Sequence, residues 1–199
     1  MRYFGGYDYT VLSVGDQSFN LNKIATLNNG ESLSGDIADK VWWSVTPRTD
    51  EILLTWSNSQ WKDMIHVVSL VIANELFADG SLTLTLTPSF NEYISNESFA
   101  IDNVRVSECG IPAVRDCEAR QEFPLETFSD SKGAWTDEGW TNAKTSDMSD
   151  LGNFLGRHDS SDNATPPSKT YDVGTDKEYA LVQFDLIKFD GWNSSEEWG

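Results

Sequence analysis

The feature that most constrains the fold of this chain is a strictly alternating segment at residues 81–87, SLTLTLT. Leu82, Leu84 and Leu86 fall on one face of an extended strand, and the intervening threonines fall on the other. Alternation with a period of two residues predicts a half-buried β-strand. Pro88 ends the pattern, because proline cannot donate a hydrogen bond to a neighbouring strand.

Short strands of this kind recur along the chain and are separated by turn signals such as Gly15-Asp16, Pro47-Arg-Thr-Asp and Asp79-Gly80. Residues 22–40 and 129–152 are polar and are expected to be mainly loops. No convincing amphipathic helix is found. These patterns predict an all-β antiparallel sandwich or jelly roll. Its strands are expected at residues 7–14, 17–21, 41–46, 51–57, 64–73, 81–87, 98–107, 123–128, 153–157, 169–173 and 179–189.

The order of these strands suggests two incomplete halves. Residues 1–107 have the character of the C-terminal half of one sandwich repeat, and residues 121–199 that of the N-terminal half of the next. Residues 108–120 form the joint between them. Reading from Gly199 into Tyr3 restores an ordinary strand order, as in a circularly permuted module. Two arrangements remain open: the halves close within one chain, or a neighbouring copy completes each half, which gives a head-to-tail filament.

The charge of the chain excludes one class of partner. The 32 acidic and 14 basic residues give a net charge of −18, whereas nucleic-acid binding needs clustered lysine and arginine. Such an acidic chain repels itself unless cations neutralise it. No run of about 18 apolar residues occurs, so no membrane span is predicted.

Cysteine and asparagine motifs favour an extracellular or cell-surface protein. Cys109 and Cys117 are eight positions apart in the joint, and we predict that they form a disulfide. Three glycosylation motifs begin at Asn96, Asn163 and Asn193, each in a polar, loop-like segment.

Acidic residues gather in two places where calcium could bind, because this ion takes six to eight oxygen ligands. One cluster surrounds the C-terminal loop and contains Asp185, Asp190, Glu196 and Glu197. The other contains Asp147, Asp150, Asp159 and Asp162. Asp185 lies within an apolar strand, so a buried side chain there must be paired or bound to metal. For most single acids, a solvated surface charge is the simpler interpretation.

Several segments resemble jelly-roll modules of the concanavalin-like or carbohydrate-binding type, which occur as tandem repeats in large secreted or surface proteins. The likeness covers most of the chain in permuted order. The segments that carry it are LGNFLGR, SKTYDV, FDGW, DMIHVVSLVI and, most specifically, SFAIDNVRVS. The resemblance implies that Asp102 in the closing strand and Glu126 in the opening strand hold a structural calcium ion.

No enzyme motif is found, and we predict a non-catalytic protein. A glycosidase needs two carboxylates at a defined separation, and the laminarinase-type Glu-x-Asp-x-x-Glu strand is absent. His66 and His158 lack triad or metal-ligand spacing, and the two cysteines lack a CxxC pattern.

Aromatic residues offer a route to sugar binding. Trp42 and Trp43 must point to opposite faces of a strand, so one of them is expected to face outward. The residues expected to stack on sugars are Trp43, Trp61 and Trp140.

Together these features predict, first, a structural subunit or repeat of an extracellular, glycosylated, calcium-braced fibre or matrix polymer. Its partners would be copies of itself, arranged head to tail, and glycans. The alternative is a carbohydrate-binding or adhesin module. A glycoside hydrolase that uses Asp185 or Asp190 ranks third.

Overall fold

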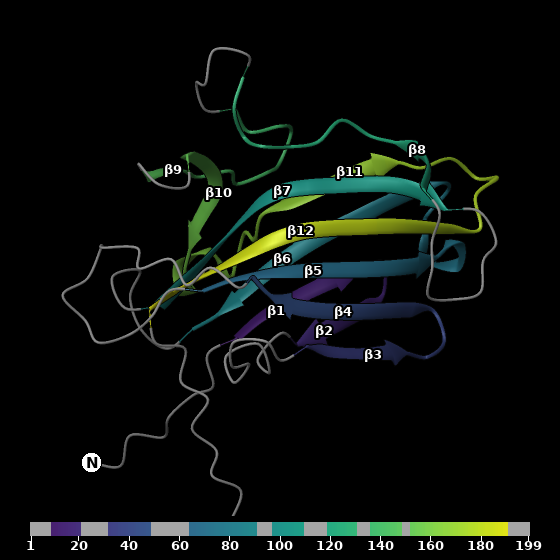
Figure 1. The fold of residues 1–199 in the computed structure, drawn as a ribbon, viewed down its shortest axis with the longest axis horizontal. Helices are drawn as coiled ribbons and strands as arrows, with labels where there is room; N and C mark the ends of the chain where they lie inside the picture. Colours follow the sequence, from purple (N-terminus) through teal and green to yellow (C-terminus); the bar gives the residue numbers. More distant parts are fainter. Residues whose placement is uncertain are drawn as a thin grey trace, which may run out of the picture.

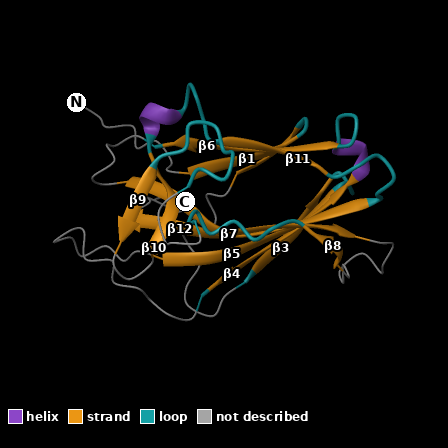
Figure 2. Ribbon diagram, turned by 90° about the horizontal axis from the view of Figure 1, so that it is seen from above, coloured by secondary structure: helices purple, strands orange, loops and turns teal. Residues whose placement is uncertain are grey.

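The computed structural model describes residues 9–20, 32–48, 64–90, 97–109, 119–130, 136–148 and 152–190. These residues form two antiparallel sheets that lie face to face (Figures 1 and 2). The predicted all-β sandwich is therefore confirmed. The described helices are two three-residue 3-10 turns, η2 (Asn74–Leu76) and η3 (Ser160–Asp162). No helix in this part of the chain is long and apolar enough to cross a membrane.

The smaller sheet has four strands in the order β11-β6-β1-β2. One of its two inner strands, β6, contains the alternating segment, and Leu82, Leu84 and Leu86 are buried as predicted. On the other face, Thr83 and Thr85 hydrogen-bond through their side chains to residues of β11. The four strands are β1 (Tyr9–Val14), β2 (Gln17–Asn20), β6 (Ser81–Ser89) and β11 (Ser168–Asp172).

The larger sheet follows the order β3-β4-β5-β12-β7-β10-β9, and β8 pairs with part of β7. Its longest strands, β7 and β12, lie side by side in the middle (Figure 1). The strands are β3 (Leu33–Ile37), β4 (Val41–Pro47), β5 (Met64–Ala73), β7 (Glu97–Cys109), β8 (Ala119–Glu122), β9 (Thr145–Met148), β10 (Gly152–His158) and β12 (Tyr179–Asp190).

Strands from residues 1–107 and from residues 121–199 share both sheets of this one chain. In the larger sheet, β12 lies between β5 and β7, and β10 pairs with the other edge of β7. In the smaller sheet, β11 pairs with β6. Most of the predicted joint, residues 110–118, lies outside the described residues.

The main core lies between the two sheets, and a smaller cluster covers the other side of the larger sheet. Leu186 belongs to the core between the sheets. Its neighbour Ile187 must face the opposite way, because side chains alternate along a strand. The smaller cluster contains Ile65, Ala100, Phe154, Ile187 and Phe189.

Three segments differ from the sequence prediction. Residues 22–40 include β3, and residues 129–152 include β9, although both regions were expected to be loops. The expected strand at 123–128 is instead a single bridge between Glu126 and Val104, preceded by β8. The expected strand at 51–57 lies outside the described residues.

The sequence of β3, LSGDI, is typical of a turn, and its pairing with β4 explains why it is extended. Gly35 lies opposite Trp43, and a Cβ atom added there would come within 2.9 Å of the indole ring. The glycine is therefore required for the close approach of the ring.

Candidate functional site

The candidate site lies on the outer face of the larger sheet, defined here as the face turned away from the smaller sheet. In β4, Val41 and Val45 are buried in the core between the sheets. Alternation then places Trp42 and Ser44 on the outer face. Their partners in β5 are Val71 and Ser69, which lie on the same face.

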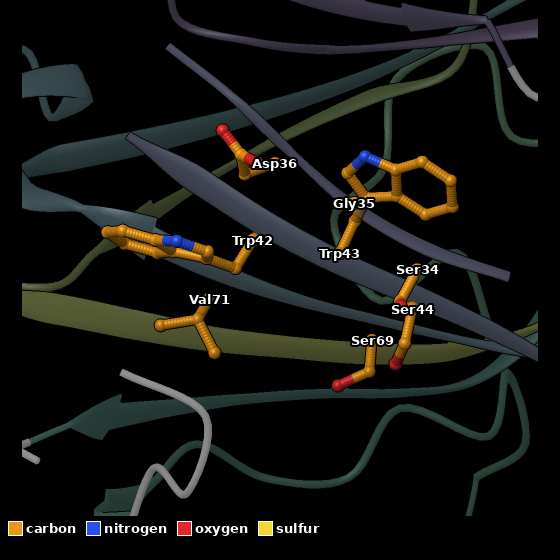
Figure 3. A pocket seen from close by; sticks show the side chains of 8 residues that line it. All are labelled: Ser34, Gly35, Asp36, Trp42, Trp43, Ser44, Ser69 and Val71. Carbon is orange, nitrogen blue, oxygen red and sulfur yellow. The ribbon is translucent and has the colours of Figure 1, made fainter. Parts of the chain in front are cut away.

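A hollow of about 350 Å³ opens at this part of the sheet (Figure 3). The half-buried indole of Trp42 forms one wall, and the ring of Tyr179 meets that indole edge-on at a centroid distance of 5.9 Å. Asp36 and three serines supply polar groups. The hollow is lined by Ser34, Gly35, Asp36, Trp42, Trp43, Ser44, Ser69 and Val71.

A row of polar side chains continues across the sheet from the hollow. Ser34, Ser44 and Ser69 lie in register on β3, β4 and β5. Gln183 of β12 lies opposite Ser69, and its Nε2 donates to the Ser69 hydroxyl at 3.4 Å. Arg105 of β7 is opposite Gln183 and is exposed. This row offers hydroxyl, amide and guanidinium groups to a ligand.

Beside this row, a β-bulge in β7 brings two carboxylates together. The register between β7 and β12 shifts between Gln183 and Asp185, and Asn103 adopts a positive φ of 52° there. The Asn103 side-chain Nδ2 donates to Asp185 Oδ2 at 2.7 Å and to Asp102 Oδ2 at 3.2 Å. Arg48 forms an ion pair with the same Asp185 oxygen at 2.9 Å. One amide therefore bridges Asp102 and Asp185, which were predicted as candidates in separate groups.

The two carboxylates have different environments. Burial raises the pKa of Asp102 to about 7, although the backbone N–H of Asn103 donates to its Oδ1 and opposes the shift. Asp185 is 5% exposed, and the Arg48 guanidinium and the Asn103 amide stabilise its charge. An acid with a raised pKa and an ion-paired aspartate thus lie side by side.

Glu126 lies among other partners, on the inner side of the sheet. Its backbone pairs with Val104, whose side chain is in the core. Its Oε2 accepts hydrogen bonds from Trp140 Nε1 at 2.8 Å and from the Tyr171 hydroxyl at 3.1 Å, and its Oε1 contacts Lys169 Nζ. The structure brings Asp102 together with Asp185, and it does not bring Asp102 together with Glu126.

The remaining acidic candidates fall into two groups. The side chains of Asp190, Glu196 and Glu197 lie outside the described residues, as do those of Asp147 and Asp150. Among the side chains that the structure does describe, no three His, Cys, Asp or Glu residues are arranged to hold a metal ion. The calcium site remains a prediction.

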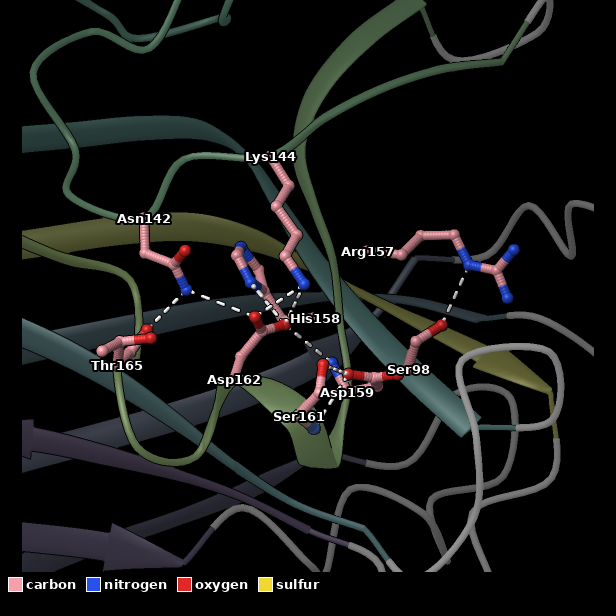
Figure 4. A network of polar contacts seen from close by, with 9 residues as sticks. All are labelled: Ser98, Asn142, Lys144, Arg157, His158, Asp159, Ser161, Asp162 and Thr165. Atoms are coloured by element: carbon pink, nitrogen blue, oxygen red, sulfur yellow. Dashed lines mark hydrogen bonds and ion pairs between the residues drawn. The ribbon is translucent and has the colours of Figure 1, made fainter.

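Asp159 and Asp162 take part in a polar network at the end of β10 (Figure 4). Asp159 caps η3 by accepting from Ser161 N at 3.0 Å. Asp162 pairs with Lys144 at 2.6 Å and contacts His158 Nδ1 at 3.2 Å. Burial lowers the pKa of His158 to about 4 in spite of that neighbouring carboxylate. Protein donors therefore already satisfy both acids.

The three tryptophans that were predicted to bind sugar differ in where they lie. Trp140 is 4% exposed, and its ring lies in the core, where its Nε1 donates to Glu126. Trp43 packs partly against the core and also lines the hollow. Trp61 lies outside the described residues. The outward residue of the pair is Trp42, which the alternation of Val41 and Val45 would have identified.

The predicted modification sites are mostly outside the described residues. Asn163 is exposed directly after η3. Asn96, Asn193 and Cys117 lie in segments that are not described, and Cys109 is described only as the last backbone position of β7. The disulfide and the glycans remain predictions.

No protein-family model, no curated protein and no solved structure matches this chain. The site is therefore interpreted from its own geometry and chemistry.

Proposed function

We propose that this protein binds carbohydrate on the outer face of its larger sheet. The observation that carries the proposal is the hollow in which the indole of Trp42 lies beside Asp36 and the serine hydroxyls (Figure 3). A sugar ring has an apolar face that packs on an aromatic ring and hydroxyls that need hydrogen-bond partners. Ligand sites commonly combine aromatic walls with a few polar groups that fix orientation.

The position of the hollow supports binding of an extended sugar chain. The polar row from Ser34 to Arg105 crosses five strands, so several sugar units have partners along it. These side chains project from paired strands rather than from loops, so their backbone positions are held before a ligand binds. A net charge of −18 disfavours polyanionic ligands, so we infer neutral glycans.

Binding to neutral polysaccharides tests the proposal, with Trp42→Ala as the deciding variant. Aromatic residues at the centre of a binding site often contribute about 2 kcal/mol or more, so Trp42→Ala should weaken binding at least tenfold. Trp42→Phe should retain part of the affinity. Affinity electrophoresis on a panel of polysaccharides, followed by calorimetry on oligosaccharides, measures the change.

The matched control is Thr170→Ala on the outer face of the smaller sheet, where the hydroxyl pairs with Thr83. This variant should bind as the wild type does. Equal affinity of the wild type and Trp42→Ala would refute the proposed site.

Glycoside hydrolysis is a second candidate, favoured by the Asp102–Asp185 pair. Glycosidases use two neighbouring carboxyl groups, of which one is protonated and one ionised. Asp102, whose pKa is raised to about 7, and Asp185, which is ion-paired with Arg48, lie together on the same face as the hollow. The same polysaccharide panel distinguishes the two functions, because release of reducing sugar indicates hydrolysis and unchanged polymer indicates binding alone.

A further inference from the structure

A lysine points inward from the edge of the smaller sheet. Lys169 is in β11, the edge strand, opposite Leu84 of β6. Leu84 is buried in the core. Lys169 lies on the same face as its cross-strand partner Leu84, so its side chain also points between the sheets. The Lys169 side chain is 17% exposed.

Its partner comes from the other sheet. Glu126 is held beside β7 by two backbone hydrogen bonds with Val104, and its side chain is 7% exposed. Lys169 Nζ contacts Glu126 Oε1. The contact therefore spans the gap between the two layers, on the side of the sandwich where β11 and β7 lie (Figures 1 and 2).

Two donors converge on the second carboxylate oxygen. Trp140 Nε1 and the Tyr171 hydroxyl lie 2.8 Å and 3.1 Å from Glu126 Oε2. Burial holds the pKa of Tyr171 far above its ordinary value, so its hydroxyl stays a donor. Fixed donors around one oxygen of a carboxyl group stabilise the negative charge that forms there when a nucleophile attacks the carbon.

The amine is placed over an aromatic ring in the same cluster. Lys169 Nζ lies 5.0 Å from the centroid of the Tyr171 ring and also contacts the backbone oxygen of Glu138. These contacts hold the nitrogen at Glu126. A held nucleophile beside its target reacts far faster than a free one.

We propose that Lys169 and Glu126 condense to an intramolecular amide that links the two sheets covalently. Lys169 Nζ first transfers one proton to Glu126 Oε1, with which it is in contact, and this leaves a neutral amine and a carboxylic acid. The amine then attacks Cδ of Glu126, and the Nζ–Cδ bond forms while Oε2 carries the negative charge between Trp140 and Tyr171. The Cδ–Oε1 bond then breaks. Two protons of the lysine ammonium leave with Oε1 as one water molecule, so no oxidant, reductant or co-reactant is needed.

The amide and a simple ion pair differ in mass by one water molecule, and intact mass spectrometry distinguishes them. We expect purified protein from a host that does not glycosylate, denatured and fully reduced, to weigh one water less than its sequence mass. Proteolysis should yield a branched peptide that joins the segments around Glu126 and Lys169. Wild-type protein at its full sequence mass would overturn the proposal.

Lys169→Arg is the matched variant, because arginine keeps the positive charge and cannot form this amide. It should have the full sequence mass and a lower melting temperature than the wild type. A loss of water that persists in Lys169→Arg would also overturn the proposal, since it would arise elsewhere in the chain. If this variant does not fold, the branched peptide of the wild type decides the question by its presence or absence.

Discussion

At the scale of single residues, Asp102 shows how the bulge sets the chemistry of the outer face. Its carboxyl is largely buried beside Asp185, and both conditions favour the neutral form. Asp185, in contrast, forms an ion pair with Arg48 at 2.9 Å. The two aspartates therefore lie in different environments because their partners differ.

This difference predicts how stability depends on pH. The pKa of Asp102 is about 7 in the folded protein and about 3.8 in the unfolded chain, so between these values only the folded state holds the proton. Stability should therefore fall as the pH rises from about 4 to 7, by about 1.4 kcal/mol for each unit of pKa difference. Asp102→Asn removes this contribution, and its unfolding free energy in urea should exceed that of the wild type at pH 8.

The comparison at low pH is the control for this variant. At pH 4 the wild-type carboxyl is neutral in the folded state, so Asp102→Asn and the wild type should be close in stability. An identical pH dependence of the two proteins from pH 4 to pH 8 would show that Asp102 is not held neutral.

At the scale of strands, the bulge at Asn103 positions three polar side chains on one face. The extra residue in β7 needs a positive φ, which asparagine tolerates better than most residues. Its side chain then reaches both Asp102 and Asp185. Asn103 therefore contributes to stability in two separate ways, through its backbone conformation and through the amide that bridges the two carboxylates.

Two substitutions separate these contributions. Asn103→Gly keeps the positive φ and loses the bridging amide, whereas Asn103→Ala loses both. We expect Asn103→Ala to be less stable than Asn103→Gly by about 1 kcal/mol, because alanine also strains the left-handed backbone. Thermal and urea unfolding measure the difference. Equal stability of the two variants would show that the positive φ at position 103 does not destabilise alanine relative to glycine.

Strands with a clear two-residue period could be predicted from the sequence, and strands held by pairing alone could not. In β6 the alternation of leucine and threonine fixed both the strand and its buried face. In β3 the local sequence favours a turn, and only the neighbouring β4 and the close approach of Trp43 to Gly35 make it extended.

The candidate site could also be predicted only where local sequence pattern, and not strand pairing, determines the structure. In the segment FAIDNVRV, Phe99 and Ile101 keep a two-residue period with each other and Val104 does not, so the alternation breaks at Asp102 and Asn103. The structure has its bulge there. The approach of Asp102 to Asp185 depends on the pairing of β7 with β12, which joins residues far apart in the chain. Neither composition nor spacing encodes that register.

At the scale of the whole molecule, one chain supplies every strand of both described sheets. In the larger sheet, β12 lies between β5 and β7, so strands from the two parts of the chain are direct neighbours. This arrangement forms the continuous outer face on which the hollow, the polar row and the carboxylate pair lie next to one another. The proposed glycan site depends on strands from both parts of the chain.

The proposed glycan site is tested most directly by nuclear magnetic resonance, with a neutral oligosaccharide from the polysaccharide panel titrated into the protein. We expect the indole N–H signal of Trp42 and the amide signals of β4, β5 and β12 to shift during the titration. The indole N–H of Trp140, which donates to Glu126 in the core, should not move. Shifts confined to the smaller sheet, or no shift with any oligosaccharide at millimolar concentration, would contradict the proposed site.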